Sequence, residues 1–172
     1  MPRFPRPRDN QIHAAYFHAQ PVGDLTLHEH DGVIVSLDWG WVPDQDPTAT
    51  LKEAKRQLET YFDGETIMFD LPLQAHGTAF QEKVWQEISK IPYGKTITYG
   101  EIARTLSSHA RAVGAACGLN PVPILIPCHR VTAADGKLTG YSGDGGLETK
   151  AALLRLEKAI PETPDLFGKR TA

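Results

Sequence analysis

Apolar and polar positions alternate along the first third of the chain in a pattern typical of half-buried strands. Residues 12–19 and 24–27 predict two strands, and residues 32–39 predict a third. Asp31-Gly32 is a hairpin signal between the second strand and the third. Residues 66–73 predict a fourth strand. With one helix between the third strand and the fourth, these elements indicate a small α+β unit.

Apolar residues at helical spacing predict that helix and four more. One of them runs to about residue 106, and the last two span about residues 109–118 and 147–159. Ser108 is the expected N-terminal cap of the helix over 109–118. The other three helices each begin at a capping box, in which a threonine and a Glu or Gln three residues later bind each other's backbone N–H groups. These boxes are Thr50-x-x-Glu53, Thr78-x-x-Gln81 and Thr98-x-x-Glu101.

The pattern places a boundary near residues 74–77. We therefore expect an N-terminal α/β domain over residues 1–75, a C-terminal domain over residues 76–160 and a flexible tail over residues 161–172. In the C-terminal domain two short helices meet at the polar turn Ser107-Ser108, which is typical of a helix-turn-helix.

The helix over 109–118 is unusual because alanine or glycine fills six of its ten positions. Such small residues allow a helix to approach either a groove or another backbone closely. Arg111 is its only certain charge, and it either projects from the helix or pairs with an acid at the helix start. The spacing leaves both interpretations open.

Composition excludes several classes of protein and of site. No apolar run among the 172 residues approaches the ~18 residues of a membrane span, so no membrane partner is expected. The basic, proline-rich N-terminus is followed by no apolar stretch, so we expect no signal peptide and a cytoplasmic location. The two cysteines, Cys117 and Cys128, exclude a disulfide scaffold and a four-thiolate zinc site. The histidines of the first domain are interpreted as scattered surface residues, and no metal site is expected.

The net charge of −3 hides an uneven distribution. Residues 1–75 carry 6 Lys/Arg against 12 Asp/Glu, a balance of −6, whereas residues 76–160 carry 10 against 7, a balance of +3. No acidic residue occurs from Ile102 to Ala134. Such a run is what a surface facing phosphates requires, although a buried segment with few charges gives the same pattern. Its basic residues are Arg104, His109, Arg111, His129 and Arg130.

Candidate chemistry lies in residues 120–131, where three prolines predict a stiff, extended segment that leads to Cys128-His129. A thiol reacts as the thiolate, which a nearby imidazole or cation favours, and His129 and Arg130 supply such groups. Neighbours on a strand point to opposite faces, so a water-mediated link would be needed between His129 and Cys128. An inert core thiol is the alternative, and Cys117 fits that description better.

Residues 80–157 contain a series of short motifs, which are Phe80-Gln81-x-x-Val84-Trp85, Ile91-Pro92-x-Gly94, Thr98-Tyr99, Ile102-Ala103, Arg111-Ala-Val-Gly114, Asn120-Pro121, Pro127-Cys128-His129-Arg130, Gly140-Tyr141-Ser142-Gly143 and Leu153-Leu154-x-x-Glu157. This set resembles that of the O6-alkylguanine-DNA alkyltransferases, also called methylated-DNA–protein-cysteine methyltransferases. The resemblance implies an α+β fold with a ribonuclease-H-like N-terminal α/β domain and a mostly helical, winged-helix-like C-terminal domain that carries a helix-turn-helix.

The resemblance implies DNA repair by a self-inactivating transferase. A methyl or small alkyl group moves from O6-alkylguanine to the protein once, without a cofactor, after the nucleotide is flipped out of the duplex; O4-alkylthymine is left open as a second lesion. Cys128 resembles the alkyl acceptor and His129 the base that activates it through a water. Glu157 resembles the carboxylate that orients the histidine, Asn120 the brace of the active-site turn, and Tyr99 the phenol that donates to guanine and helps to rotate the nucleotide.

The implied partner is double-stranded DNA containing alkylated guanine, bound through the minor groove by the small-residue helix. Arg111 resembles the finger that fills the space left by the flipped base. Tyr141 and Ser142, with the backbone of Cys128 and Val131, resemble the pocket for that base. A monomer in solution is expected, and clustering on DNA is left open. The other predicted DNA contacts are Tyr99, Ala110, Ala112, Gly114 and Ala115.

The chain departs from the family pattern in four places. The turn before Arg111 is short, and Asp144-Gly145 is inserted near the pocket, which puts the loop that closes the pocket in doubt. Gly118 stands where some relatives have a cation, and the N-terminal domain lacks the cysteines that hold zinc in some relatives.

Two other functions are compatible with part of the pattern. A non-catalytic sensor of alkylated bases would not need Cys128. A Cys-His thiol hydrolase would leave Arg111 and the tyrosines without a role.

Overall fold

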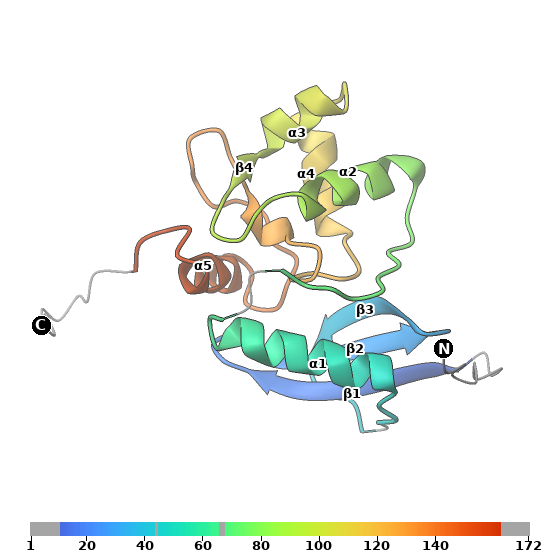
Figure 1. The fold of residues 1–172 in the computed structure, drawn as a ribbon. Coiled ribbons are helices and arrows are strands. Elements are labelled where there is room, and N and C mark those ends of the chain that lie inside the picture. Colours follow the sequence, from blue (N-terminus) through green and yellow to red (C-terminus); the bar gives the residue numbers. More distant parts are fainter. Residues whose placement is uncertain (1–10, 44, 66–67, 163–172) are drawn as a thin grey trace, which may run out of the picture.

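The structure is a computed structural model that describes residues 11–43, 45–65 and 68–162. Its N-terminal part is an antiparallel sheet in the order β1-β2-β3, with one helix, α1, against it (Figure 1). The apolar positions that alternate along the strands turn inward, and Phe17, Leu25, Leu27 and Ile34 are buried there. The elements are β1 (Ile12–Ala19), β2 (Gly23–His30), β3 (Val33–Trp39) and α1 (Ala49–Phe62).

The predicted hairpin is confirmed, since Asp31 and Gly32 have positive φ angles of 51° and 82°, as a tight turn between two strands requires. The predicted capping box at Thr50 is wrong. Thr48 is the N-cap, and its side chain accepts from the backbone N–H of Leu51. Glu53 binds Arg56 one turn later instead.

The predicted strand over residues 66–73 is also wrong where the structure describes it. Residues 66–67 lie outside the described residues, and from residue 68 onward only an isolated bridge joins Leu73 to Ile34. Ile34 donates to Pro72 O at 2.8 Å, and Gln74 donates to Ile34 O at 2.9 Å. The segment is an extended connection beside β3 that leads to the second domain. The predicted tail lies mostly in residues 163–172, outside the described residues.

The C-terminal part is mostly helical, and α3 and α4 pack against each other as the predicted helix pair. The capping boxes at Thr78 and Thr98 are both present. The predicted cap at Ser108 is wrong, because His109 is the N-cap of α4 and makes no side-chain bond there. The elements are α2 (Ala79–Ser89), β4 (Ile97–Thr98), α3 (Tyr99–Thr105), α4 (Ala110–Gly118), a 3-10 turn (Cys128–Arg130), β5 (Val131–Thr132), which pairs in parallel with β4, and α5 (Leu147–Leu156).

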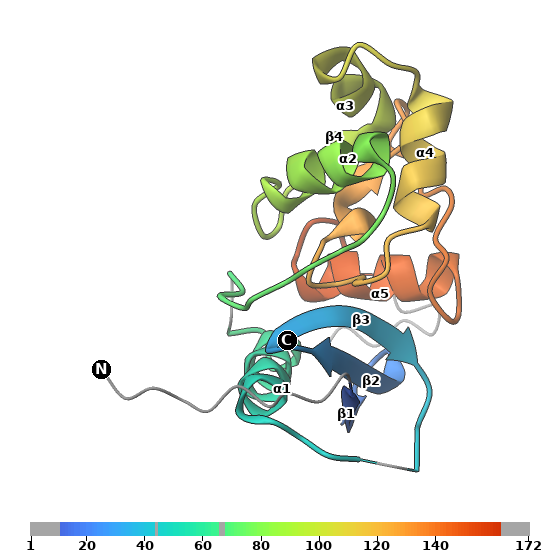
Figure 2. The same cartoon turned by 90° about the vertical axis from the view of Figure 1, so that its right-hand side faces the viewer.

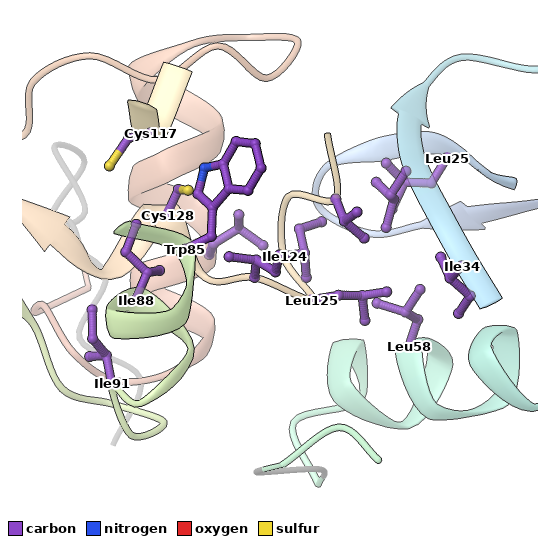
Figure 3. Packing of buried hydrophobic residues seen from close by; sticks show 14 of the residues in the cluster. Leu25, Ile34, Leu58, Trp85, Ile88, Ile91, Cys117, Ile124, Leu125 and Cys128 are labelled. Atoms are coloured by element: carbon purple, nitrogen blue, oxygen red, sulfur yellow. The ribbon is translucent and has the colours of Figure 1, made fainter. Parts of the chain in front are cut away.

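One apolar core runs through both parts, and α5 lies between the sheet and the upper helices (Figures 1 and 2). Ile124 and Leu125, from the loop before the 3-10 turn, lie between the side chains of the two parts (Figure 3). Leu37 of β3 also donates to Pro121 O at 3.0 Å. The sheet domain therefore packs directly against the segment that precedes Cys128.

No helix within the described ranges is long and apolar enough to cross a membrane. The same residues contain no group of three or more His, Cys, Asp or Glu side chains that could hold a metal ion. The four N-terminal histidines instead pair with aspartates, namely His13 with Asp46, His18 with Asp24, His28 with Asp38 and His30 with Asp31.

Candidate active site

The segment before Cys128 is a compact turn, and the predicted extended conformation is wrong. Ile124 has a positive φ of 72°, and Ile126 donates to Val122 O at 2.9 Å. The three prolines have no backbone N–H to contribute to a regular ladder, and the chain folds back between Val122 and Ile126. Cys128 then begins a 3-10 turn. His129 consequently does not lie on the opposite face of a strand from Cys128.

Asn120 holds this turn closed. Its Nδ2 donates to Ile126 O and to Cys128 Sγ, both at 2.9 Å, and its Oδ1 accepts from Val122 N at 3.0 Å. The side chain is buried, so these bonds are not weakened by competing water. Asn120 therefore closes the turn and also donates a hydrogen bond to the sulfur, and its role as the brace of an active site stays a prediction.

The Cys128 thiol is buried, with 5% of its surface exposed, and Cys117 of α4 lies beside it (Figure 3). The neighbouring Cys117 thiol and burial raise the pKa of Cys128, whereas the Asn120 amide and the Lys150 ammonium favour its thiolate. Removal of the proton from Cys128 therefore depends on nearby donors and on a base.

His129 and Glu157 form a fully buried pair. His129 Nε2 lies 2.7 Å from Glu157 Oε1. Because the carboxylate can only accept, Nε2 carries the proton, which leaves Nδ1 as an acceptor. Nδ1 is buried and has no partner among the described residues. Burial lowers the pKa of His129 below 6.5, so the ring is neutral near pH 7 and can take up a proton.

Glu157 caps the C-terminus of α5 and accepts five hydrogen bonds. Burial alone would raise its pKa, but the bonds from His129, Arg130 and Tyr61 outweigh burial and hold the pKa at about 2. The carboxylate is therefore ionised at every physiological pH. A buried charge of this kind is tolerated only where donors surround it.

Arg130 does not supply positive charge to Cys128, which corrects the interpretation from the sequence. Its Nε and Nη2 each lie 2.9 Å from Glu157, and Nη1 donates to Ile91 O at 2.7 Å. The basic residues of the run without acids, from Ile102 to Ala134, thus lie partly on the surface and partly in the core. Arg104, His109 and Arg111 are exposed, and His129 and Arg130 are buried.

The cation near the sulfurs is Lys150 of α5, which was not among the predicted site residues. It is fully buried, and its Nζ donates to Val131 O at 2.6 Å, Thr139 O at 2.9 Å and the Tyr99 hydroxyl at 3.3 Å. Lys150 precedes Glu157 by seven residues, and this spacing places both on one face of a helix. This seven-residue spacing was the feature of the sequence that could have identified Lys150.

A cavity of about 540 Å³ opens beside Cys128. It brings together seven of the predicted residues, whereas His129, Glu157, Asn120, Val131, Ala112 and Ala115 do not line it. Its lining is Tyr99, Ala110, Arg111, Gly114, Cys117, Gly118, Cys128, Thr139, Gly140, Tyr141 and Ser142. The predicted alkyl acceptor therefore lies in a pocket formed by α4 and by the loop after β5.

Two tyrosines face this cavity with their hydroxyls protonated. Burial raises the pKa of Tyr99 to about 12, and its hydroxyl donates to Thr139 O at 3.0 Å. Burial also raises the pKa of Tyr141, whose buried hydroxyl has no partner among the described residues. Trp39 of β3 packs edge-on against Tyr141, with ring centroids 6.1 Å apart. The sheet domain thus supports one wall of the pocket.

The loop beyond the pocket depends on Gly143, because a Cβ there would collide with the rings of Tyr141 and Trp39. The inserted Asp144 is exposed and does not line the cavity. Its backbone carbonyl accepts from Thr149 Oγ1, and its side chain accepts from Gly145 N at 3.1 Å. The backbone of Asp144 therefore contacts the first turn of α5, and its carboxylate stays outside the pocket.

The outer face of α4 consists of alanine and glycine residues and one cation. Arg111 is exposed and makes no ion pair or hydrogen bond within the part of the chain that the structure describes, so the pairing considered from the sequence is not observed. Ala110, Ala115 and Gly118 are exposed around it, and Ala112 and Gly114 are partly exposed. Figure 2 shows α4 at the outer side of the C-terminal part.

Two family models match the chain. The model described as "6-O-methylguanine DNA methyltransferase, ribonuclease-like domain" matches residues 13–75, and "6-O-methylguanine DNA methyltransferase, DNA binding domain" matches residues 79–159. The mixed α+β fold predicted from the sequence is confirmed.

Curated relatives and solved structures agree with the models. A methylated-DNA–protein-cysteine methyltransferase of Mycobacterium bovis is 45% identical over 151 residues, covering 81% of this chain and 88% of the relative. One from Methanosarcina barkeri is 52% identical, covering 80% and 92%. The crystal structure of Mycobacterium tuberculosis O6-methylguanine methyltransferase matches with a TM-score of 0.76 at 43% identity, covering 92% of this chain and all of that chain. The OGT of the same organism in complex with DNA gives 0.74 at 44% identity, covering 86% and 93%.

The contacts of the Cys128 sulfur predict opposite effects for two substitutions. Cys117→Ala removes the neighbour that raises the pKa of Cys128, so the thiol should react with iodoacetamide at lower pH. Asn120→Asp replaces the donor to sulfur with a negative charge of equal shape, so reaction should require higher pH. Mass spectrometry of the Cys128 adduct across pH measures both. Shifts in the same direction would contradict this description of the sulfur.

Proposed function

The chain belongs to the 6-O-methylguanine DNA methyltransferase family and is a methylated-DNA–protein-cysteine methyltransferase of alkyl-transfer DNA repair, and we propose that Cys128 is its alkyl acceptor. The observation that carries this assignment is the position of Cys128 in the cavity, beside Asn120 and next to the buried His129–Glu157 pair. Cys117 lines the same cavity but has no such brace. Membership of this family also counts against the thiol-hydrolase interpretation.

In the proposed reaction, His129 accepts the Cys128 proton through a water, and the thiolate attacks the alkyl carbon. The new bond is carbon–sulfur, and the bond that breaks joins that carbon to guanine O6. The electron pair of the broken bond passes to the guanine. Glu157 keeps the proton on Nε2, so Nδ1 is the acceptor. The thioether is stable and no cofactor removes the group, so each molecule acts once.

Guanine gains negative charge as the alkyl group leaves, and we propose Tyr99 as the donor that meets this charge. Its raised pKa keeps the hydroxyl protonated until the reaction occurs. Lys150 Nζ, at 3.3 Å, donates to the same oxygen and would stabilise it once its proton shifts toward the base. Tyr141, Ser142 and the backbone at Cys128 and Val131 are proposed to hold the extruded base, with methyl or small alkyl groups as the transferred class and O4-alkylthymine as a further candidate lesion.

DNA is the partner of this family, and we propose that α4 binds it through the minor groove. Ala110, Ala112, Gly114 and Ala115 give a surface without long side chains, which permits close approach and little base reading. Arg111, free of protein partners in the described residues, is proposed to enter the base stack as the finger. We propose that the protein binds as a monomer.

Incubation with duplex DNA containing O6-methylguanine should leave one methyl group on Cys128 and restore guanine. The tryptic peptide of residues 112–130 contains both cysteines, so tandem mass spectrometry must locate the methyl group between them. Cys128→Ser is the control and should show no transfer. A methyl group on Cys117, or lesion binding without transfer, would contradict the assignment.

Arg111→Ala should slow repair of duplex DNA by about tenfold or more, because unstacking a base costs a few kcal/mol and about 1.4 kcal/mol corresponds to tenfold. Reaction with the free alkylated base should be almost unchanged, since no stack has to be opened. Arg104→Ala, which removes an exposed charge on α3, is the matched control and should affect both substrates little. Equal losses on both substrates in Arg111→Ala would rule out the finger role.

A further inference from the structure

One side chain of the sheet domain reaches the buried pair at the site. Tyr61 lies in the last turn of α1 and is 1% exposed. Its hydroxyl donates to Glu157 Oε1 at 2.6 Å, across 96 positions of sequence. The bond joins the N-terminal domain directly to the carboxylate that holds His129.

The Tyr61 ring is fixed in place by aromatic neighbours. Ring centroids of Phe62, Phe69 and Tyr93 lie 5.1, 5.3 and 6.1 Å away. Burial and the charge of Glu157 raise the pKa of Tyr61 well above its ordinary value, so the hydroxyl always carries its proton. Tyr61 is therefore a permanent donor with one orientation.

The choice of acceptor distinguishes this tyrosine from one that merely fills a core. A buried tyrosine hydroxyl needs a partner, and a backbone carbonyl would be sufficient. Tyr61 instead donates to Oε1, the atom that also accepts from His129 Nε2 at 2.7 Å and Arg130 Nη2 at 2.9 Å. A third donor fixes the direction of that oxygen and withdraws charge from it. Both effects act on the imidazole.

We propose that Tyr61 is a positioning residue for the alkyl transfer: its hydroxyl orients Glu157 and moderates the charge that Glu157 presents to His129, so that the ring stays a neutral base. This inference rests on the proposed function. It also gives the N-terminal domain a part in the chemistry.

The other charged and titratable groups near His129 and Glu157 determine how the pKa of His129 responds to loss of the Tyr61 hydroxyl. Burial has the largest effect on the pKa of His129 and lowers it. Glu157 raises this pKa, whereas Arg130 of the 3-10 turn and Lys150 of α5 lower it further. Tyr93 and the backbone of Gly94, from the loop after α2, also face Glu157, and Gly94 N donates to Oε2 at 3.3 Å. Without the Tyr61 hydroxyl, Oε1 keeps more charge for His129, and the pKa of His129 should rise.

Tyr61→Phe keeps the ring and removes only the hydroxyl. We expect the single-turnover rate of methyl transfer, at saturating lesion DNA, to fall roughly threefold to tenfold at neutral pH. Toward acid pH the rate declines as His129 becomes protonated, and the midpoint of this decline should move upward by roughly one pH unit, which is a tenfold change in proton affinity. Affinity for lesion DNA should not change.

Tyr93→Phe is the matched control. Tyr93 lies in the same aromatic cluster, but its hydroxyl donates to the backbone carbonyl of Leu156 at 3.2 Å. This variant should keep the wild-type midpoint. A complementary variant carries 3-fluorotyrosine at position 61, where the fluorine strengthens the donor without removing it. Its midpoint should move to lower pH than in the wild type.

The proposal is overturned if the midpoint stays fixed in both Tyr61 variants, even where Tyr61→Phe is slower at every pH, because a structural role predicts uniform slowing. It is also overturned if Tyr93→Phe shifts the midpoint equally. Failure of the proposed function is a separate outcome, in which wild-type protein leaves no methyl group on Cys128. Wild-type transfer with fixed midpoints would remove this inference alone.

Discussion

The buried carboxylate of Glu157 is the constraint on which the site depends. An ion that has lost its water must find its hydrogen bonds within the protein, and Glu157 receives them from three parts of the chain. The donors come from α1, the loop after α2 and the 3-10 turn, while the carboxylate itself ends α5. Each donor restricts where its own segment can lie. The charge therefore fixes the arrangement of two domains around the residue next to Cys128.

The same arrangement separates the charges that the chemistry has to control. Arg130 neutralises Glu157, so the cation that influences the sulfurs is Lys150. His129 remains neutral, because burial and the charges of both cations lower its pKa. In the proposed reaction, Cys128 starts as a protonated thiol, because Cys117 and burial raise its pKa, and it loses its proton to His129.

Local signals in the sequence predicted much of the fold. The hairpin at Asp31-Gly32 and the capping boxes at Thr78 and Thr98 depend on neighbours within four residues, and the structure contains all three. The box at Thr50 failed because Thr48, two residues earlier, caps the helix instead. The compact turn before Cys128 was missed because Asn120 closes it with side-chain bonds that no spacing rule describes. The domain limits at residues 75 and 160 stay predictions.

The residues around Cys128 were predictable only as far as the motifs extend. Contact between Tyr61 and Glu157 joins positions 96 residues apart, and the edge-on packing of Trp39 on Tyr141 joins positions even farther apart in sequence. Neither leaves a local pattern, because each contact exists only once the domains have packed.

The central claim is that Glu157 keeps the His129 proton on Nε2 and leaves Nδ1 as the base. Nitrogen-15 NMR of histidine-labelled protein at pH 7 tests this directly, with His129→Gln used to assign the signal. The structure predicts a neutral ring with a protonated Nε2 and an unprotonated Nδ1, and a change in both signals in Glu157→Gln. A proton on Nδ1 in the resting protein, whether in the other neutral tautomer or in a charged ring, would contradict the account.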